Sequence, residues 1–208
     1  RRSFDGVRAM IRSPKFDVDL FASRPVRIEP GAFNDGSDGA QAFWGVYTTT
    51  RIAPPLALDL YYLGMDRDRA AFSVGTGKER RHSLGARLWG RSGALDYNAE
   101  GVWQFGDFAG RDIGAYTAAL DWGYTLALPL SPRLGMKANI SSGDKDPDDD
   151  RLGTFNPLFP NHAYFSEAGF GAPMNAYDLQ PNISVRPASR MTVLVGLDFI
   201  WKNRKTDA

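Results

Sequence analysis

Residues 132–142 read Pro-Arg-Leu-Gly-Met-Lys-Ala-Asn-Ile-Ser-Ser. Apolar side chains occupy every second position from Leu134 to Ile140, and the positions between them are charged, polar or glycine. Because successive side chains of a β-strand point to opposite faces of its sheet, this segment predicts a strand with one apolar and one polar face. The same alternation recurs in residues 190–202 and 94–106.

Ten segments of this kind follow one another along the chain, each roughly 9–14 residues long, which suits a tilted strand that crosses a bilayer. They lie at residues 4–12, 16–26, 40–51, 56–66, 80–91, 94–106, 112–126, 132–142, 178–187 and 190–202. Helical periodicity is nearly absent, and no apolar run approaches the roughly 18 residues of a membrane helix. The expected fold is all-β: an antiparallel up-and-down transmembrane β-barrel, of which about ten strands are present.

Composition excludes several other classes of protein. The chain has 208 residues, a net charge of +1 and no cysteine. The near-neutral charge argues against a nucleic-acid binder, which would carry a basic face, and thiol or disulfide chemistry has no residue to perform it. A mean hydropathy of −0.35 is compatible with a barrel, whose strands alternate apolar and polar side chains. The length favours a single domain over residues 1–208.

The expected connections alternate between short and long. Short ones lie at 13–15, 53–55, 92–93, 130–132 and 187–189, and longer ones at 27–39, 67–79, 107–111 and 143–177. Bacterial outer-membrane barrels have tight periplasmic turns and longer outer loops, so both ends of the chain are expected on the outer side. We therefore expect further strands beyond each end. Two alternatives are a ten-stranded barrel that closes on itself and a soluble two-layer β-sandwich.

Charged residues fall on the polar positions of the expected strands. The basic members are Arg8, Arg51, Arg87, Arg91, Arg133, Lys137 and Arg186, and the acidic members are Asp17, Asp19, Asp59, Asp96, Glu100 and Asp198. Cross-strand ion pairing, at about 0.2–1 kcal/mol per pair, accounts for any single pair. Guanidinium groups in excess of the carboxylates would form a track for a polyanion, because arginine binds carboxylates with two donors and stays charged.

Tryptophan and tyrosine near the strand ends predict interfacial girdles. The candidates are Trp44, Tyr62, Trp89, Trp103, Trp122, Tyr124 and Trp201. Trp89 and Tyr47 fall on the inward positions, where stacking on sugar rings is the alternative.

Other sites are weakly indicated. Clustered carboxylates at Asp144, Asp146 and Asp148 suit Ca²⁺, although their spacing does not match an EF-hand and a solvated loop is the alternative. His82 and His162 lack metal-ligand spacing. No catalytic set is present, so the sequence predicts neither an enzyme nor another cofactor.

Several segments resemble the alginate-export family of outer-membrane porins. They are Phe43–Tyr47, Asp59–Gly64, Arg81–Gly90, Asp96–Asn98 and, most distinctive, Ser142-Gly143-Asp144 followed by Leu152–Pro160 and Tyr164-Phe165. The resemblance implies a monomeric barrel of about eighteen strands with a basic, constricted lumen that passes mannuronate-rich alginate outward. The chain would then be the C-terminal part of the barrel without its last strands. The seven basic residues above are the positions that could select the polymer.

The sequence thus predicts a conduit in the outer membrane of a Gram-negative bacterium, surrounded by lipid, for an anionic polysaccharide such as alginate. Periplasmic export components are a further expected partner. Residues 143–177 are too apolar for a free loop, and we expect them to fold into the lumen as a gate. A diffusion porin for small solutes and a soluble carbohydrate-binding module remain the alternatives.

Overall fold

A computed structural model describes residues 3–53, 55–160 and 173–207, and within these ranges the secondary structure is entirely β. The strands are β1 (Phe4–Arg12), β2 (Phe16–Arg27), β3 (Gly36–Ser37), β4 (Gln41–Ala53), β5 (Leu56–Phe72), β6 (Gly75–Ser92), β7 (Leu95–Phe108), β8 (Arg111–Thr125), β9 (Arg133–Ser141), β10 (Arg151–Leu152), β11 (Ala176–Ala188), β12 (Met191–Gly196) and β13 (Phe199–Lys202). The described residues include no helix long and apolar enough to span a membrane.

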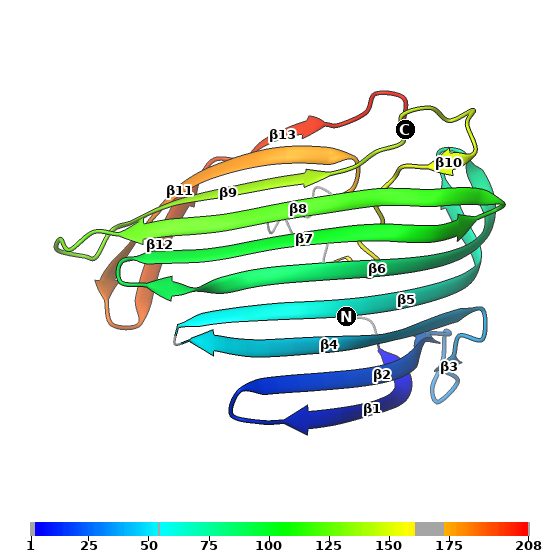
Figure 1. The fold of residues 1–208 in the computed structure, drawn as a ribbon, viewed down its shortest axis with the longest axis horizontal. Helices are drawn as coiled ribbons and strands as arrows, with labels where there is room; N and C mark the ends of the chain where they lie inside the picture. Colours follow the sequence, from blue (N-terminus) through cyan, green and yellow to red (C-terminus); the bar gives the residue numbers. More distant parts are fainter. Residues whose placement is uncertain (1–2, 54, 161–172, 208) are drawn as a thin grey trace.

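The long strands form one curved antiparallel sheet in which each pairs with the next along the chain (Figure 1). The order is β1-β2-β4-β5-β6-β7-β8-β9-β11-β12, and β12 and β13 both pair with β11 as two halves of one interrupted strand. The sheet is open, because β1 does not pair with β12 or β13. The predicted all-β, up-and-down architecture is confirmed, and an open sheet of this kind is consistent with a stretch of barrel wall.

Two of the predicted loops are wrong. Residues 67–79 are mostly strand, because β5 and β6 continue to a turn at Ser73-Val74, and β7 and β8 meet at an equally tight turn, Ala109-Gly110. Charged side chains stabilise the extended hairpin: Arg80 Nη2 lies 3.1 Å from Asp66 Oδ2, and Arg67 pairs with Glu79. Ala109 and Gly110 have positive φ angles of 54° and 84°, which allow the tight turn.

The strict alternation of short and long connections therefore does not hold, and the orientation argued from it loses its basis. The two ends of the sheet are named here by their connections. The loop end is where β9 ends at Ser141 and β11 begins at Ala176, and the turn end is where β6 ends at Ser92 and β7 begins at Leu95.

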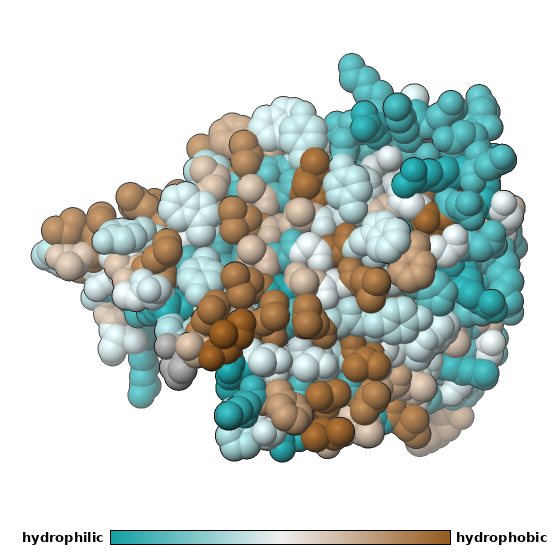
Figure 2. Space-filling view, in the orientation of Figure 1, coloured by the Kyte–Doolittle hydropathy of each residue, from teal (hydrophilic) through white to brown (hydrophobic). Residues whose placement is uncertain are grey.

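The register separates the side chains into an apolar face and a polar face. Leu134, Ile140, Val195 and Phe199 share the apolar face, where they are 49%, 37%, 63% and 46% exposed. A soluble sandwich would bury these side chains under a second sheet, and the described residues form no such second layer. Figure 2 shows the apolar face, with hydrophobic and aromatic residues across most of it and hydrophilic residues gathered at the loop end.

The apolar band has the height of a bilayer core. Along β7 it extends from Leu95 to Phe105, which is roughly 33 Å along the strand and about 25 Å along the membrane normal at a tilt of about 40°. Asp107 then lies in a charged row that runs from Asp66 through Arg80 to Asp112.

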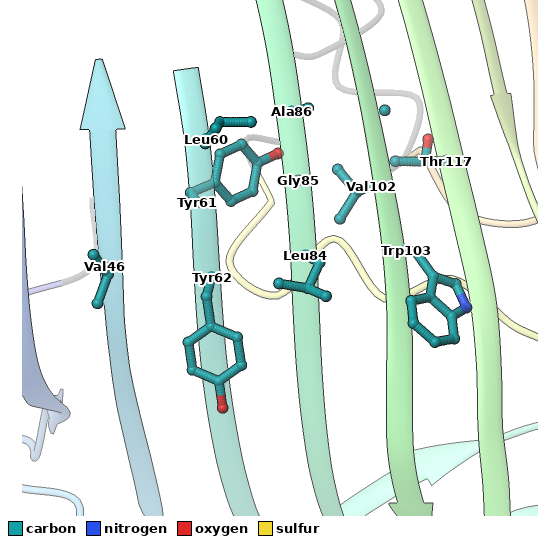
Figure 3. A pocket seen from close by; sticks show the side chains of 11 residues that line it. Val46, Leu60, Tyr61, Tyr62, Leu84, Gly85, Ala86, Val102, Trp103 and Thr117 are labelled. Atoms are coloured by element: carbon teal, nitrogen blue, oxygen red, sulfur yellow. The ribbon is translucent and has the colours of Figure 1, made fainter. Parts of the chain in front are cut away.

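Aromatic rings border this charged row at the loop end. The His82 and Phe105 ring centroids are 5.2 Å apart, and the Trp103 and Phe105 centroids are 5.0 Å apart. Tyr62 Oη lies 2.7 Å from His82 Nδ1. Between the rings, the small residues Ala86 and Gly101 leave a shallow apolar depression of about 680 Å³, bounded by Leu60, Tyr62, Leu84 and Trp103 (Figure 3).

A charge placed in the middle of the apolar face should destabilise the protein in lipid. We expect Leu120→Arg to lower the free energy of unfolding in lipid vesicles by about 2–4 kcal/mol, since lipid cannot solvate the guanidinium group. Ala119→Arg, one residue along β8 on the polar face, should cost much less. Denaturant titration followed by heat-modifiable gel mobility measures both changes, and equal losses would contradict the two-faced assignment.

Candidate functional site on the polar face

The register places the charged residues predicted to line the path on the polar face wherever they lie in paired strands. Arg186 lies at the register shift of β11, and Asp198 lies between β12 and β13. The group on β1, β2 and β4 forms exposed ion pairs. Arg8 Nη2 lies 2.9 Å from Asp19 Oδ1, and Arg51 Nη2 lies 2.5 Å from Asp17 Oδ2. Arg12 also contacts Asp19, at 2.8 Å. Pairs this exposed contribute little stability, so their arginines can exchange partners readily.

The Asp59 carboxylate is the centre of a second cluster and is almost completely buried, at 2% exposure. Its Oδ2 accepts hydrogen bonds from Tyr47 Oη at 2.8 Å and Trp89 Nε1 at 3.0 Å, and Arg87 Nη1 lies 3.4 Å away. Arg87 also donates from Nε to Asn98 Oδ1 at 2.7 Å. The cluster fixes the Arg87 guanidinium from two sides. It also holds the two inward aromatics through their polar atoms.

Two longer interactions cross an intervening strand at a glycine. Arg133 Nε on β9 donates to Asp96 Oδ2 on β7 at 2.9 Å, and Tyr61 Oη on β5 donates to Glu100 Oε1 on β7 at 2.5 Å. A Cβ at Gly123 would lie 2.1 Å from Arg133 Cζ, and one at Gly85 would lie 2.1 Å from Tyr61 Cζ. Figure 3 shows Tyr61 lying across Gly85. Only glycine leaves room for these crossings.

Three of the predicted basic residues form no salt bridge with any described residue: Arg91, Lys137 and Arg186. All three are exposed. Arg91 donates to Thr125 Oγ1 at 3.4 Å and lies opposite Asp96 in the register, and Lys137 lies opposite Asp121. These cations have carboxylates nearby but no direct salt bridge within the described residues.

A polar depression of about 280 Å³ lies between Arg87 and Lys137. Its other lining side chains include Asn98, Glu100, Asp121 and Gln180. Guanidinium, ammonium and amide groups in one hollow can bind a carboxylate together with sugar hydroxyls. The two acids also present would limit the affinity for an anion.

Residues 152–160, here called the strap, cross the polar face from β8 toward β1 and pass behind β6 to β8 in Figure 1. Leu152 pairs with Ile113 on β8, and the Phe159 ring packs edge-on against Phe4 and Phe43 at 4.9 and 5.0 Å. In its middle, Asn156 is hydrogen-bonded to Gln104 on β7. The strap thus lies over the wall along its whole length.

The wall beneath the strap holds residues that the sequence did not single out. Arg67, Glu79 and Arg81 form an ion-pair cluster in which Glu79 and Arg81 are fully buried and Arg67 is half-buried, and Gln104 and Ser83 lie beside it. Glu79 lies in the segment 67–79, which the sequence analysis assigned to a loop, so it was not assigned to either face. The strand alternation of β6 and β7 places three of these residues on the polar face: Arg81, Ser83 and Gln104. The alternation in the sequence could therefore have identified them as candidates.

The base of the strap explains the distinctive Ser142-Gly143-Asp144 motif. Asp144 Oδ1 accepts a hydrogen bond from Gly153 N at 3.2 Å. Asp207 Oδ2 accepts from Asp144 N at 2.8 Å and from Thr154 Oγ1 at 2.7 Å. Asp207 Oδ1 accepts from Ser73 Oγ at 2.6 Å. The two carboxylates therefore join the strap to the C-terminal segment and to the β5–β6 turn.

The structure separates the carboxylates of the predicted calcium site. Asp144 is buried, whereas Asp146 and Asp148 are exposed, and Asp146 Oδ1 accepts from the backbone of Asp148 at 3.1 Å. No group of three or more acidic or histidine side chains within the described ranges could hold a metal ion. The calcium site stays a prediction from the sequence alone. His162 and the pair Tyr164-Phe165 lie outside the described residues.

Burial raises the pKa of the Asp144 carboxyl above its ordinary value, and the neighbouring Asp149 and Asp207 add to the effect against the hydrogen bond from Gly153. A raised pKa means that this group favours the folded state at low pH and that this contribution is lost as the pH rises through the raised value. Asp144→Asn cannot ionise and keeps the acceptor for Gly153. We therefore expect the variant to be more stable than the wild type at pH 7. The difference should shrink as the pH falls through the raised pKa and should be small below about pH 4.

Unfolding in urea at several pH values measures this difference. Asp146→Asn, which changes an exposed carboxylate nearby, is the matched control and should be nearly neutral at every pH. A wild-type protein more stable than Asp144→Asn at pH 7 would show that the buried charge is compensated.

Comparison with known proteins agrees with this geometry. The family model described as alginate export matches residues 1–208, and no curated protein matches. The description names a transport role, in keeping with a two-faced sheet whose polar face carries fixed and free cations. Because the match covers the whole sequence, the chain belongs to the alginate export family.

Proposed function

We propose that the sheet is part of the wall of an outer-membrane channel, and that an anionic polysaccharide, an alginate-like polyuronate, passes along its polar face. The family supports export of alginate as the role. The channel proposal rests mainly on one observation: the sheet has an exposed apolar face and an opposite face that carries charged side chains, among them Arg87 and Arg133. Such a sheet needs lipid on one side and water on the other.

The basic residues would act in two ways. Arg91, Lys137 and Arg186 are exposed and form no salt bridge with a described residue, so they would attract the carboxylates of the polymer. Arg87 and Arg133 are held by Asp59 and Asp96, so they present guanidinium groups in fixed positions. A polymer with one carboxylate per sugar would move from one group to the next. Passage requires contacts strong enough to admit the chain and weak enough to release it.

The acidic residues would keep those contacts weak. Each carboxylate beside an arginine competes with the polymer for the same donors, as Asp96 does at Arg133. Bound uronate groups would therefore dissociate quickly. We propose that the carboxylates both position the arginines and prevent the polymer from stalling.

We also propose that the strap is a gate. It carries no charge and lies across the polar face between β8 and β1, where it would narrow the lumen. The buried Phe155 and Leu152 favour this arrangement when no polymer is present.

The remaining expectations concern the whole channel. We propose a monomeric barrel of about eighteen strands in the outer membrane of a Gram-negative bacterium, with lipid acyl chains against Leu60, Leu84 and Trp103. Periplasmic export components would deliver the polymer. No catalytic step or cofactor is part of this proposal.

A diffusion porin for small solutes is the second candidate. The mixed charge of the depression between Arg87 and Lys137, where Glu100 and Asp121 also lie, favours it. A lumen of that kind would pass monosaccharides and small ions without preference for a polyanion.

Ion selectivity and polymer block in planar bilayers separate the two candidates. For the full-length protein, we expect oligomannuronate to block the current at concentrations at least tenfold below those of mannuronate, because several carboxylates bind at once. Lys137→Gln should raise the blocking concentration of the oligomer about threefold and reduce anion selectivity, by loss of one exposed charge.

Arg24→Gln makes the same change of charge on the opposite face of the sheet and is the control, with no effect on block expected. Equal block by the oligomer and the monomer would favour the small-solute porin. No change in Lys137→Gln would remove Lys137 from the path.

A further inference from the structure

The structure assigns a concealed binding site to the polar face: we infer that Arg81, Gln104 and Ser83 form a subsite for a uronate sugar, which the main chain of the strap occupies in the closed arrangement. The inference rests on the proposed function, because it concerns the same polymer. It adds a site that only an open strap would expose.

The strap contacts this part of the wall mainly through its backbone. Gln104 Oε1 accepts from Asn156 N at 2.9 Å, and Gln104 Nε2 donates to Asn156 O at 2.7 Å and to Ser83 Oγ at 3.1 Å. Arg81 Nη1 donates to Thr154 O at 3.3 Å. Sugar hydroxyls and a carboxylate offer the same donors and acceptors as these backbone groups.

The charge beneath the strap is not balanced. Arg67 and Arg81 both pair with the one carboxylate of Glu79, so this cluster keeps one excess positive charge. Arg81 and Glu79 are 0% exposed. Residues 152–160, which cover the cluster, contain no charged side chain. A neutral segment therefore lies over a buried cationic site.

Arg81 is also short of acceptors. Its Nη2 is buried and has no hydrogen-bond partner in the described part of the chain. A buried donor without an acceptor is costly. A carboxylate is a stronger acceptor for guanidinium than a backbone carbonyl, so a uronate would satisfy Arg81 better than Thr154 O does.

The strap is built so that its middle can leave while its base stays. Leu152 is fully buried against Ala70, Phe108 and Ile113, which fixes the base to the sheet. Gly153 follows directly and offers a flexible joint. A uronate that binds Arg81 and Gln104 would displace Thr154 O and the Asn156 backbone. It would also have to break the hydrogen bonds from Thr154 Oγ1 to Asp207 and from Phe155 N to Ser142 O. The polymer itself would then open the gate.

A thiol on the strap tests this inference, because the chain contains no cysteine. Asn156 is buried, and Asn156→Cys keeps the backbone groups that pair with Gln104. It removes the side-chain hydrogen bonds to Glu79 Oε1 at 3.3 Å and from Leu158 N at 2.9 Å, so Asn156→Cys alone is the reference for every rate. We expect slow modification of the full-length protein by an uncharged maleimide in lipid vesicles. Oligomannuronate should raise the rate about tenfold, whereas a neutral maltooligosaccharide of equal length should not.

Second substitutions in the Asn156→Cys background separate the two halves of the inference. Gln104→Leu removes both contacts to the Asn156 backbone, so modification should be about tenfold faster without any sugar. Gln41→Leu is the matched control, since Gln41 donates to Asp38 and not to the strap. Arg81→Gln should abolish the response to oligomannuronate. Gel mobility before and after heating checks that each variant folds. If Arg81→Gln does not fold, Gln104→Leu still tests whether the strap covers the site.

Three results would overturn the concealed site. The first is that oligomannuronate blocks the current but leaves the modification rate of Asn156→Cys unchanged. The second is that the neutral sugar raises the rate equally. The third is that Gln104→Leu in the Asn156→Cys background is modified no faster than Asn156→Cys alone. If oligomannuronate neither blocks the current nor changes the rate, the proposed function itself fails.

Discussion

Backbone pairing in a single antiparallel layer is the constraint on which the rest of the structure depends. Each long strand satisfies its hydrogen bonds with its neighbours along the chain, so side chains must alternate between the two faces. A register shift of one residue would move Arg133 and Lys137 into the apolar band and Leu134 onto the polar face. The register of β9 against β8 and β11 therefore decides both the membrane contact and the position of the cations.

Two glycines allow side chains to interact with strands that are not their immediate neighbours. Gly85 and Gly123 let Tyr61 and Arg133 reach carboxylates two strands away. Side chains tied across three strands lose rotamer freedom that flexible surface pairs keep. The result is a wall in which some cations are held by carboxylates two strands away, whereas others, such as Lys137, are exposed.

The sequence predicted the strands and the two faces because alternation is local, and it persists from Leu134 to Ile140 without reference to the rest of the chain. It failed at residues 67–79, where Arg67 pairs with Glu79 across a hairpin. The contact between Asn156 and Gln104 depends on a segment that returns to a strand 52 positions earlier, and no local pattern encodes it. The crossing of Arg133 over Gly123 likewise requires knowledge of which strands are neighbours.

The neutrality of the strap decides how strongly it can hold the wall. Acidic residues are plentiful just before it, from Asp144 to Asp150, yet none occurs between Leu152 and Pro160. An aspartate opposite Arg81 would form a buried ion pair, and breaking such a pair leaves an uncompensated charge at a cost of about 3–5 kcal/mol. Backbone carbonyls bind a guanidinium group more weakly than a carboxylate does, so a uronate can replace them at Arg81. A segment that covers cations without carrying an anion can thus remain closed to water and neutral sugars while it yields to a polyanion.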